Sequence, residues 1–138
     1  MTTTHYGFGI TIRDVTFENV VRRVTAALKD EGFGVLTEID VRETLKKKLD
    51  VEFRPYVNLG ACNPPLAKRA LEAEPDIGLL LPCNVIVEQQ GEGQVHVALA
   101  DPKAMFALVD NAAVAPVAEE AEERLRRVVS ALAQKESV

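Results

Sequence analysis

The sequence predicts an α+β fold, in which one mostly antiparallel sheet carries helices packed on one face. Two observations predict it. Residues 85–87 and 95–99 are rich in valine and flank Gly91-Glu92-Gly93, a pattern typical of an antiparallel hairpin. The predicted helices are interspersed with strands and are apolar along one stripe only, as expected for a single helical layer against a sheet.

The N-terminal part of the chain predicts a strand–helix–strand unit. Residues 6–12 have the apolar and small side chains of a strand, and Thr16 stands where a helix N-cap is expected. The helix ends near Gly32, because glycine tolerates the positive φ of a helix terminus. A second strand follows at 33–39. The side chains that the helix buries are spaced three and four apart: Val20, Val21, Val24, Ala27 and Leu28.

A short helix and a third strand come next. Asp40, with Glu43 three residues later, predicts a reciprocal capping box for a helix over residues 41–49. Residues 56–59 then predict a strand that ends at the corner Gly60-Ala61-Cys62.

Two further helices begin after a polar cap and a proline. Asn63 offers a side-chain cap for a helix from Pro64 to about Glu74, which stops before Pro75. Asp101-Pro102 repeats the pattern and predicts a helix to about Val109.

The final helix is expected over about 117–133. It has a buried stripe of Ala121, Leu125, Val128 and Leu132, and glutamate–arginine pairs four residues apart on its exposed face.

Length and composition indicate one soluble domain over residues 1–138. The formal net charge of −5 disfavours nucleic acid as a partner, because phosphate backbones attract clustered basic side chains. The N-terminus lacks the pattern of a secretory signal, and the apolar runs are too short to span a membrane. We therefore expect a cytoplasmic protein without a membrane partner, in which cysteines stay reduced.

The two cysteines, each followed by asparagine, are the main candidates for chemistry or ligand contact. Cys62 precedes a predicted helix, whose unpaired N–H groups and dipole favour a reactive thiolate. In the alternative, which we favour, Cys62 is a small buried side chain at a corner and Asn63 is simply a cap. Cys83 follows Pro82 at the start of a strand, where Asn84 could bond a ligand or the backbone. The spacing excludes a Cys-x-x-Cys motif.

Other candidate groups give weaker signals. His5 and His96 are too scattered to form a metal site with the two cysteines, so we predict neither a metal nor a cofactor. Asp101 could serve as a general base, although an aspartate before proline and a helix is more often a cap.

Three segments resemble the domain of unknown function 302 family. They are residues 31–41 (EGFGVLTEIDV), 59–64 (LGACNP) and 78–85 (GLLLPCNV), and the resemblance covers roughly residues 5–107. It implies a small fold with an antiparallel sheet laid out like that of TATA-box-binding-protein-like domains, commonly found as a homodimer. It implies no particular reaction, substrate or cofactor. It also leads us to expect the two Cys-Asn dipeptides close together.

These observations support two hypotheses of different classes. The first is a non-enzymatic domain that binds a small molecule or a protein and acts as a homodimer, with a pocket near the Cys-Asn dipeptides. Self-association would cover apolar surface that one helical layer leaves exposed. The alternative is a thiol-dependent enzyme or redox sensor, with Cys62 as nucleophile, Cys83 as resolving thiol and Asn63 stabilising negative charge.

Overall fold

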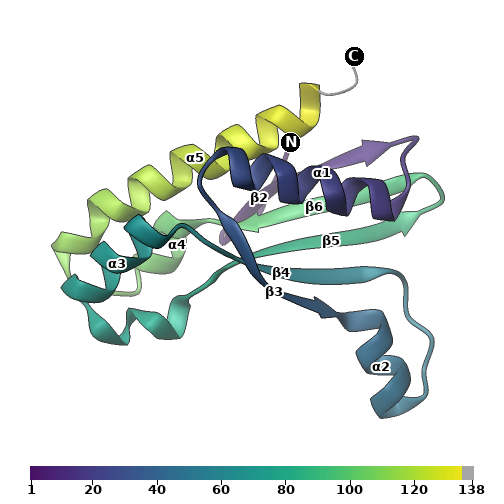
Figure 1. Ribbon diagram of the computed structural model, residues 1–138, viewed down its shortest axis with the longest axis horizontal. Helices are drawn as coiled ribbons and strands as arrows, with labels where there is room; N and C mark the ends of the chain where they lie inside the picture. The colour runs from purple at the N-terminus through teal and green to yellow at the C-terminus, as the bar shows by residue number, and fades with distance from the viewer. Residues whose placement is uncertain (135–138) are drawn as a thin grey trace.

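The computed structural model describes residues 1–134, in which six strands form one antiparallel sheet. The order of strands across the sheet is β1-β2-β6-β5-β4-β3 (Figure 1). The predicted α+β class is therefore confirmed. The strands are β1 (Thr2–Thr3), β2 (Gly7–Arg13), β3 (Gly34–Asp40), β4 (Tyr56–Cys62), β5 (Cys83–Gly91) and β6 (Gln94–Ala100).

The long helices cover one face of this sheet, and the opposite face carries no helical layer (Figure 1). The helix α2 stands apart, at the end of β3. Within residues 1–134, no helix is both long and apolar enough to cross a membrane. The helices are α1 (Phe17–Asp30), α2 (Val41–Leu49), α3 (Pro64–Ala73), α4 (Pro102–Phe106) and α5 (Ala115–Gln134), with 3₁₀ turns η1 (Pro75–Leu80) and η2 (Ala112–Val114).

Alternation along the strands places the core between the sheet and the helices. In β6, Val95, Val97 and Leu99 are buried under the helices, while His96 and Ala98 point to the open face. The helices supply the other half of the core, with α1 and α5 in direct contact. The predicted stripes are confirmed except at Val21, which is only half-buried.

The four predicted N-cap residues all form the expected side-chain hydrogen bonds at helix N-termini. The side chains of Thr16, Asn63 and Asp101 accept hydrogen bonds from the backbone N–H groups of the first turns. Asp40 does the same for α2, accepting from the N–H of Glu43 at 2.9 Å. The Glu43 carboxylate, however, pairs with Lys47 at 2.8 Å instead of returning to the cap. Of the expected reciprocal capping box, the hydrogen bond from the Glu43 N–H to Asp40 is therefore present, and the return bond from the Glu43 carboxylate is not.

Element boundaries differ from the prediction at two places that bear on the site. Residues 60–62 continue β4 instead of forming a corner, because Gly60 leaves room for close pairing: a Cβ there would lie 2.3 Å from Thr37 Oγ1. The helix after Asp101 ends at Phe106 instead of Val109. Leu108, just beyond it, is exposed and gains no burial from a longer helix.

Candidate functional site

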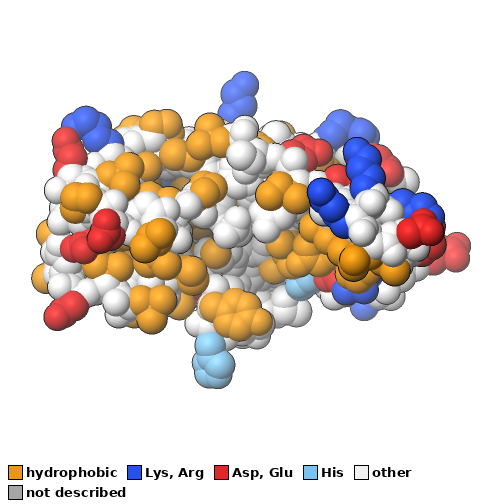
Figure 2. All heavy atoms as spheres, turned by 90° about the horizontal axis from the view of Figure 1, so that it is seen from below, with side chains coloured by type: hydrophobic (Ala, Val, Ile, Leu, Met, Phe, Trp, Pro, Cys, Tyr) orange, Lys and Arg blue, Asp and Glu red, His pale blue; other side chains and the backbone are white. Residues whose placement is uncertain are grey.

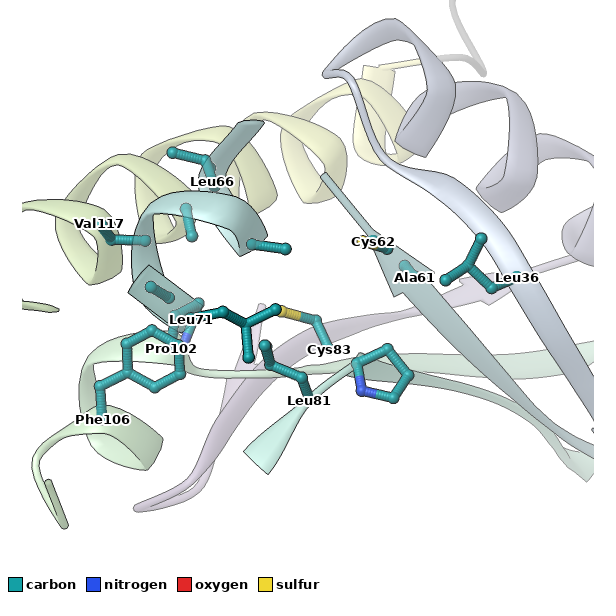
Figure 3. A pocket seen from close by; sticks show the side chains of 14 residues that line it. Leu36, Ala61, Cys62, Leu66, Leu71, Leu81, Cys83, Pro102, Phe106 and Val117 are labelled. Carbon is teal, nitrogen blue, oxygen red and sulfur yellow. The ribbon is translucent and has the colours of Figure 1, made fainter. Parts of the chain in front are cut away.

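Strand pairing brings the two cysteines together. Ala61 in β4 pairs with Cys83 in β5, so Cys62 lies one residue from the register partner of Cys83. Both cysteines are half-buried free thiols that line the same cavity of about 260 Å³ (Figure 3). The expected proximity of the two dipeptides is confirmed at the cysteines. We call this space the thiol cavity.

The wall of the thiol cavity is apolar. Leu66 of α3, Phe106 of α4 and Val117 of α5 line it from the helical side (Figure 3), and Ala70 of α3 also contributes to the wall. Leu36 reaches the cavity from β3, where a bulge between Val35 and Thr37 shifts the register. Among the described residues that line it, none carries a charge. The cavity therefore suits an apolar occupant.

The environment of Cys83 suppresses its ionisation. Burial raises the pKa of this thiol to about 11, and the nearby Cys62 contributes a smaller effect in the same direction. At neutral pH Cys83 therefore stays protonated, and a protonated thiol is a poor nucleophile. This disfavours Cys83 as an attacking or resolving thiol in the folded protein.

Asn63 is part of the framework and not of the cavity wall. Its side-chain oxygen accepts from the N–H of Leu66 at 3.2 Å, and its amide nitrogen donates to the carbonyl oxygen of Glu31 at 3.5 Å. Gly32 packs against it with a φ of 85°, and a Cβ at Gly32 would lie 2.9 Å from Asn63 Nδ2. The favoured structural interpretation of Asn63 as a cap is the one that the geometry supports.

The remaining candidates lie elsewhere. Asn84 is exposed and lines a separate groove on the open face. Asp101 caps α4 by accepting from Lys103 N at 2.9 Å. His96 lies on the open face, and the part of the chain that the structure describes contains no group of three or more residues suited to hold a metal ion. Of the five candidates, the structure gathers only the two cysteines into one cavity.

Sequence reasoning missed the aliphatic side chains that shape the cavity. Leu66 and Ala70 are spaced four apart and are a readable helical stripe, but that spacing predicts burial without saying that space remains beside them. The position of Leu36 in the cavity wall depends on a β-bulge, and no residue pattern in the strand predicts that bulge. The cavity could therefore be found only from the assembled fold.

Comparisons with known proteins agree with this architecture. The model of the domain of unknown function DUF302 matches residues 8–132, a span that includes most of α5. The chain is also similar to a solved structure, an uncharacterized conserved DUF302 protein from Bacillus stearothermophilus, with a TM-score of 0.83 and 28% sequence identity. The match covers 93% of this chain and 98% of the other. A comparison with curated proteins gives no match.

Proposed function

Because the chain belongs to the DUF302 family, whose description leaves its function open, we propose a function from the thiol cavity: non-enzymatic binding of a small apolar molecule. One observation carries the proposal. The two cysteines and the surrounding aliphatic side chains line a single space of about 260 Å³ whose described lining residues carry no charge. We further propose that the protein acts in the cytoplasm as a homodimer.

The size and polarity of the cavity indicate what it can hold. An apolar cavity of about 150 Å³ in another protein stays dry and takes up benzene. The thiol cavity is larger, which suits a substituted ring or a short aliphatic chain. Such a ligand would gain about 25 cal/mol for each Å² of apolar surface that it removes from water.

Self-association is supported by apolar side chains at the β3–α2 end of the molecule. Ile39, Leu49 and Val51 are all exposed there. Figure 2 shows hydrophobic side chains gathered at both ends of the open face, with a hollow between them. Exposed apolar groups that cluster in this way are typical of interaction surfaces, and a second copy of the chain is the simplest partner.

The binding proposal can be tested with benzene and 1-hexanol as probes. We expect both to raise the melting temperature of the protein and to shift the amide NMR signals of α3 and of the strand ends at Cys62 and Cys83. Ala67→Leu should abolish these effects by filling the cavity, which Ala67 lines. Ala26→Leu, on an exposed face of α1, is the matched control. The proposal would be refuted if neither probe, added close to its solubility limit in water, shifted these amide signals.

The thiol-dependent alternative uses the same cavity and is kept as the second candidate, because Cys62 lines the cavity wall beside Cys83. A thiol-dependent reaction needs one thiol that ionises readily. Because the pKa of Cys83 is raised, Cys62 is the candidate that remains for the nucleophile. Rapid, selective alkylation of Cys62 in the folded protein would support it. Equal and slow alkylation of both cysteines would exclude it.

A further inference from the structure

The open face of the sheet contains a groove that is separate from the thiol cavity. Figure 2 shows this face hollowed at its centre. The groove has a volume of about 530 Å³, within the range of small-molecule sites. Gly7, Ala98 and Ala100 lie along β2 and β6 and leave this part of the groove without long side chains. β2 and β6 approach so closely that a Cβ at Gly7 would lie 2.8 Å from the carbonyl oxygen of Leu99.

A row of polar side chains crosses the sheet at one end of the groove. Thr11 in β2 pairs with His96 in β6, His96 pairs with Glu88 in β5, and Glu88 pairs with Tyr56 in β4. Directly opposite residues in an antiparallel sheet point to the same face, so the four side chains lie side by side on it. The last three line the groove.

Each member of this row has a defined hydrogen-bonding capacity. Thr11 Oγ1 lies 3.2 Å from His96 Nδ1, and when the hydroxyl donates, the imidazole proton is on Nε2, which becomes a donor. Glu88 is an acceptor whose Oε2 is held by Arg54 Nε. Burial and the charge of Glu88 raise the pKa of Tyr56, so its hydroxyl keeps its proton and can donate. With His96 in this tautomer, the order across the strands is a donor at His96, an acceptor at Glu88 and a donor at Tyr56.

We propose that this groove binds a planar heterocycle with an imide edge, in which two carbonyl oxygens flank an N–H. The carbonyl groups would accept from His96 Nε2 and the Tyr56 hydroxyl, and the N–H would donate to the Glu88 carboxylate. Hydrogen bonds to a charged acceptor are about twice as strong as neutral ones, so the N–H contact dominates recognition. The flat ring would lie over the small side chains of Ala98 and Ala100.

The ligand side of the proposal is tested with lumiflavin and uracil, which carry such an edge, and with their N3-methyl derivatives, which lack the N–H. Fluorescence titration for lumiflavin and NMR titration for uracil should show saturable binding of at least one parent ring. The matching N3-methyl derivative should bind at least about tenfold more weakly, because it leaves Glu88 without its donor. Absence of binding by both parents, or equal affinity for parent and derivative, overturns the proposal.

Two matched pairs of variants test the roles assigned to Glu88 and Tyr56. Glu88→Leu should abolish binding, whereas Arg54→Leu breaks the same ion pair, keeps the carboxylate and should bind the ring. Tyr56→Phe should weaken binding about three- to tenfold by removing one hydroxyl. Thr25→Val, on α1, is a control for loss of a hydroxyl elsewhere. Binding that survives Glu88→Leu in a folded protein, or that is lost equally in Arg54→Leu, counts against the assignment.

Discussion

The side-chain amide of Asn63 donates to the carbonyl oxygen of Glu31, which stands at the C-cap of α1. Arg124 Nη1, from α5, donates to the same oxygen at 3.1 Å. Because Asn63 also caps α3, one buried side chain joins the end of α1 to the start of α3. The thiol cavity lies beside this junction, since Cys62 directly precedes Asn63.

Asn63→Ala should therefore lower the free energy of unfolding by about 2 kcal/mol. The variant removes the cap of α3, worth about 1 kcal/mol, and leaves the buried N–H of Leu66 without an acceptor, which adds a desolvation penalty. The carbonyl oxygen of Glu31 keeps its hydrogen bond from Arg124. Urea denaturation measures it. Thr16→Ala removes an exposed cap from α1 and should cost only about 1 kcal/mol. Equal losses in the two variants would contradict the bridging role of Asn63.

Gly60→Ala should destabilise the protein by about 1–3 kcal/mol, because the added methyl group would meet Thr37 Oγ1 at 2.3 Å and Pro82 Cγ at 2.9 Å. Thermal unfolding measures the effect. Gly34→Ala is the control, since a Cβ there has no neighbour within 4 Å among the described residues. Combining Gly60→Ala with Thr37→Ala should recover part of the loss. No difference between Gly60→Ala and Gly34→Ala would refute the steric argument.

The raised pKa of Cys83 predicts slow alkylation. In a Cys62→Ser variant at pH 8, a thiol of pKa about 11 is ionised in about one molecule in a thousand. Iodoacetamide should react far more slowly with the folded protein than with the protein in urea. The rate in the folded state should still be rising as the pH passes 10. A rate that levels off near pH 9 would contradict the prediction.

The Cys83 thiol also makes the stability of the folded protein depend on pH. Its pKa is higher in the folded protein than the ordinary value of 9.0, so between about pH 9 and pH 11 the folded state holds more protons than the unfolded state. Stability is therefore complete below pH 9 and is lost as the pH rises toward 11, by up to about 2 kcal/mol. Cys83→Ala should show a shallower decline. The difference between the two urea-unfolding curves isolates Cys83 from lysine and tyrosine titration, and parallel curves would count against burial as the cause.

The proposed homodimer predicts that charge at the β3–α2 end weakens self-association. Ile39→Glu and Val51→Glu, at exposed apolar positions, should shift the sedimentation coefficient toward that of a monomer. Leu79→Glu is the control, because Leu79 is 88% exposed in η1, away from β3 and α2. A wild-type protein that sediments as a monomer at micromolar concentration would refute the dimer.

Local signals predicted the elements well where a residue acts on its own neighbours. Thr16, Asp40, Asn63 and Asp101 cap the helices expected after them, because a cap needs only a side chain and the next turn of backbone. Prediction was poorer for element boundaries that are set by contacts between residues far apart in the chain. The extension of β4 through Cys62 depends on pairing with β3 and β5, and the end of α4 depends on which side chains find a core.

The sequence by itself determined the α+β class, the order of the principal strands and helices, and the buried stripes, because periodicity and capping are local properties of the chain. The tertiary structure alone decided which candidate residues meet. Antiparallel pairing placed Cys83 beside Cys62 and turned Asn84 to the opposite face. The same pairing aligned His96 with Glu88 and Tyr56. Strand register and the space left between packed layers depend on contacts between residues far apart in the chain, which no local pattern encodes.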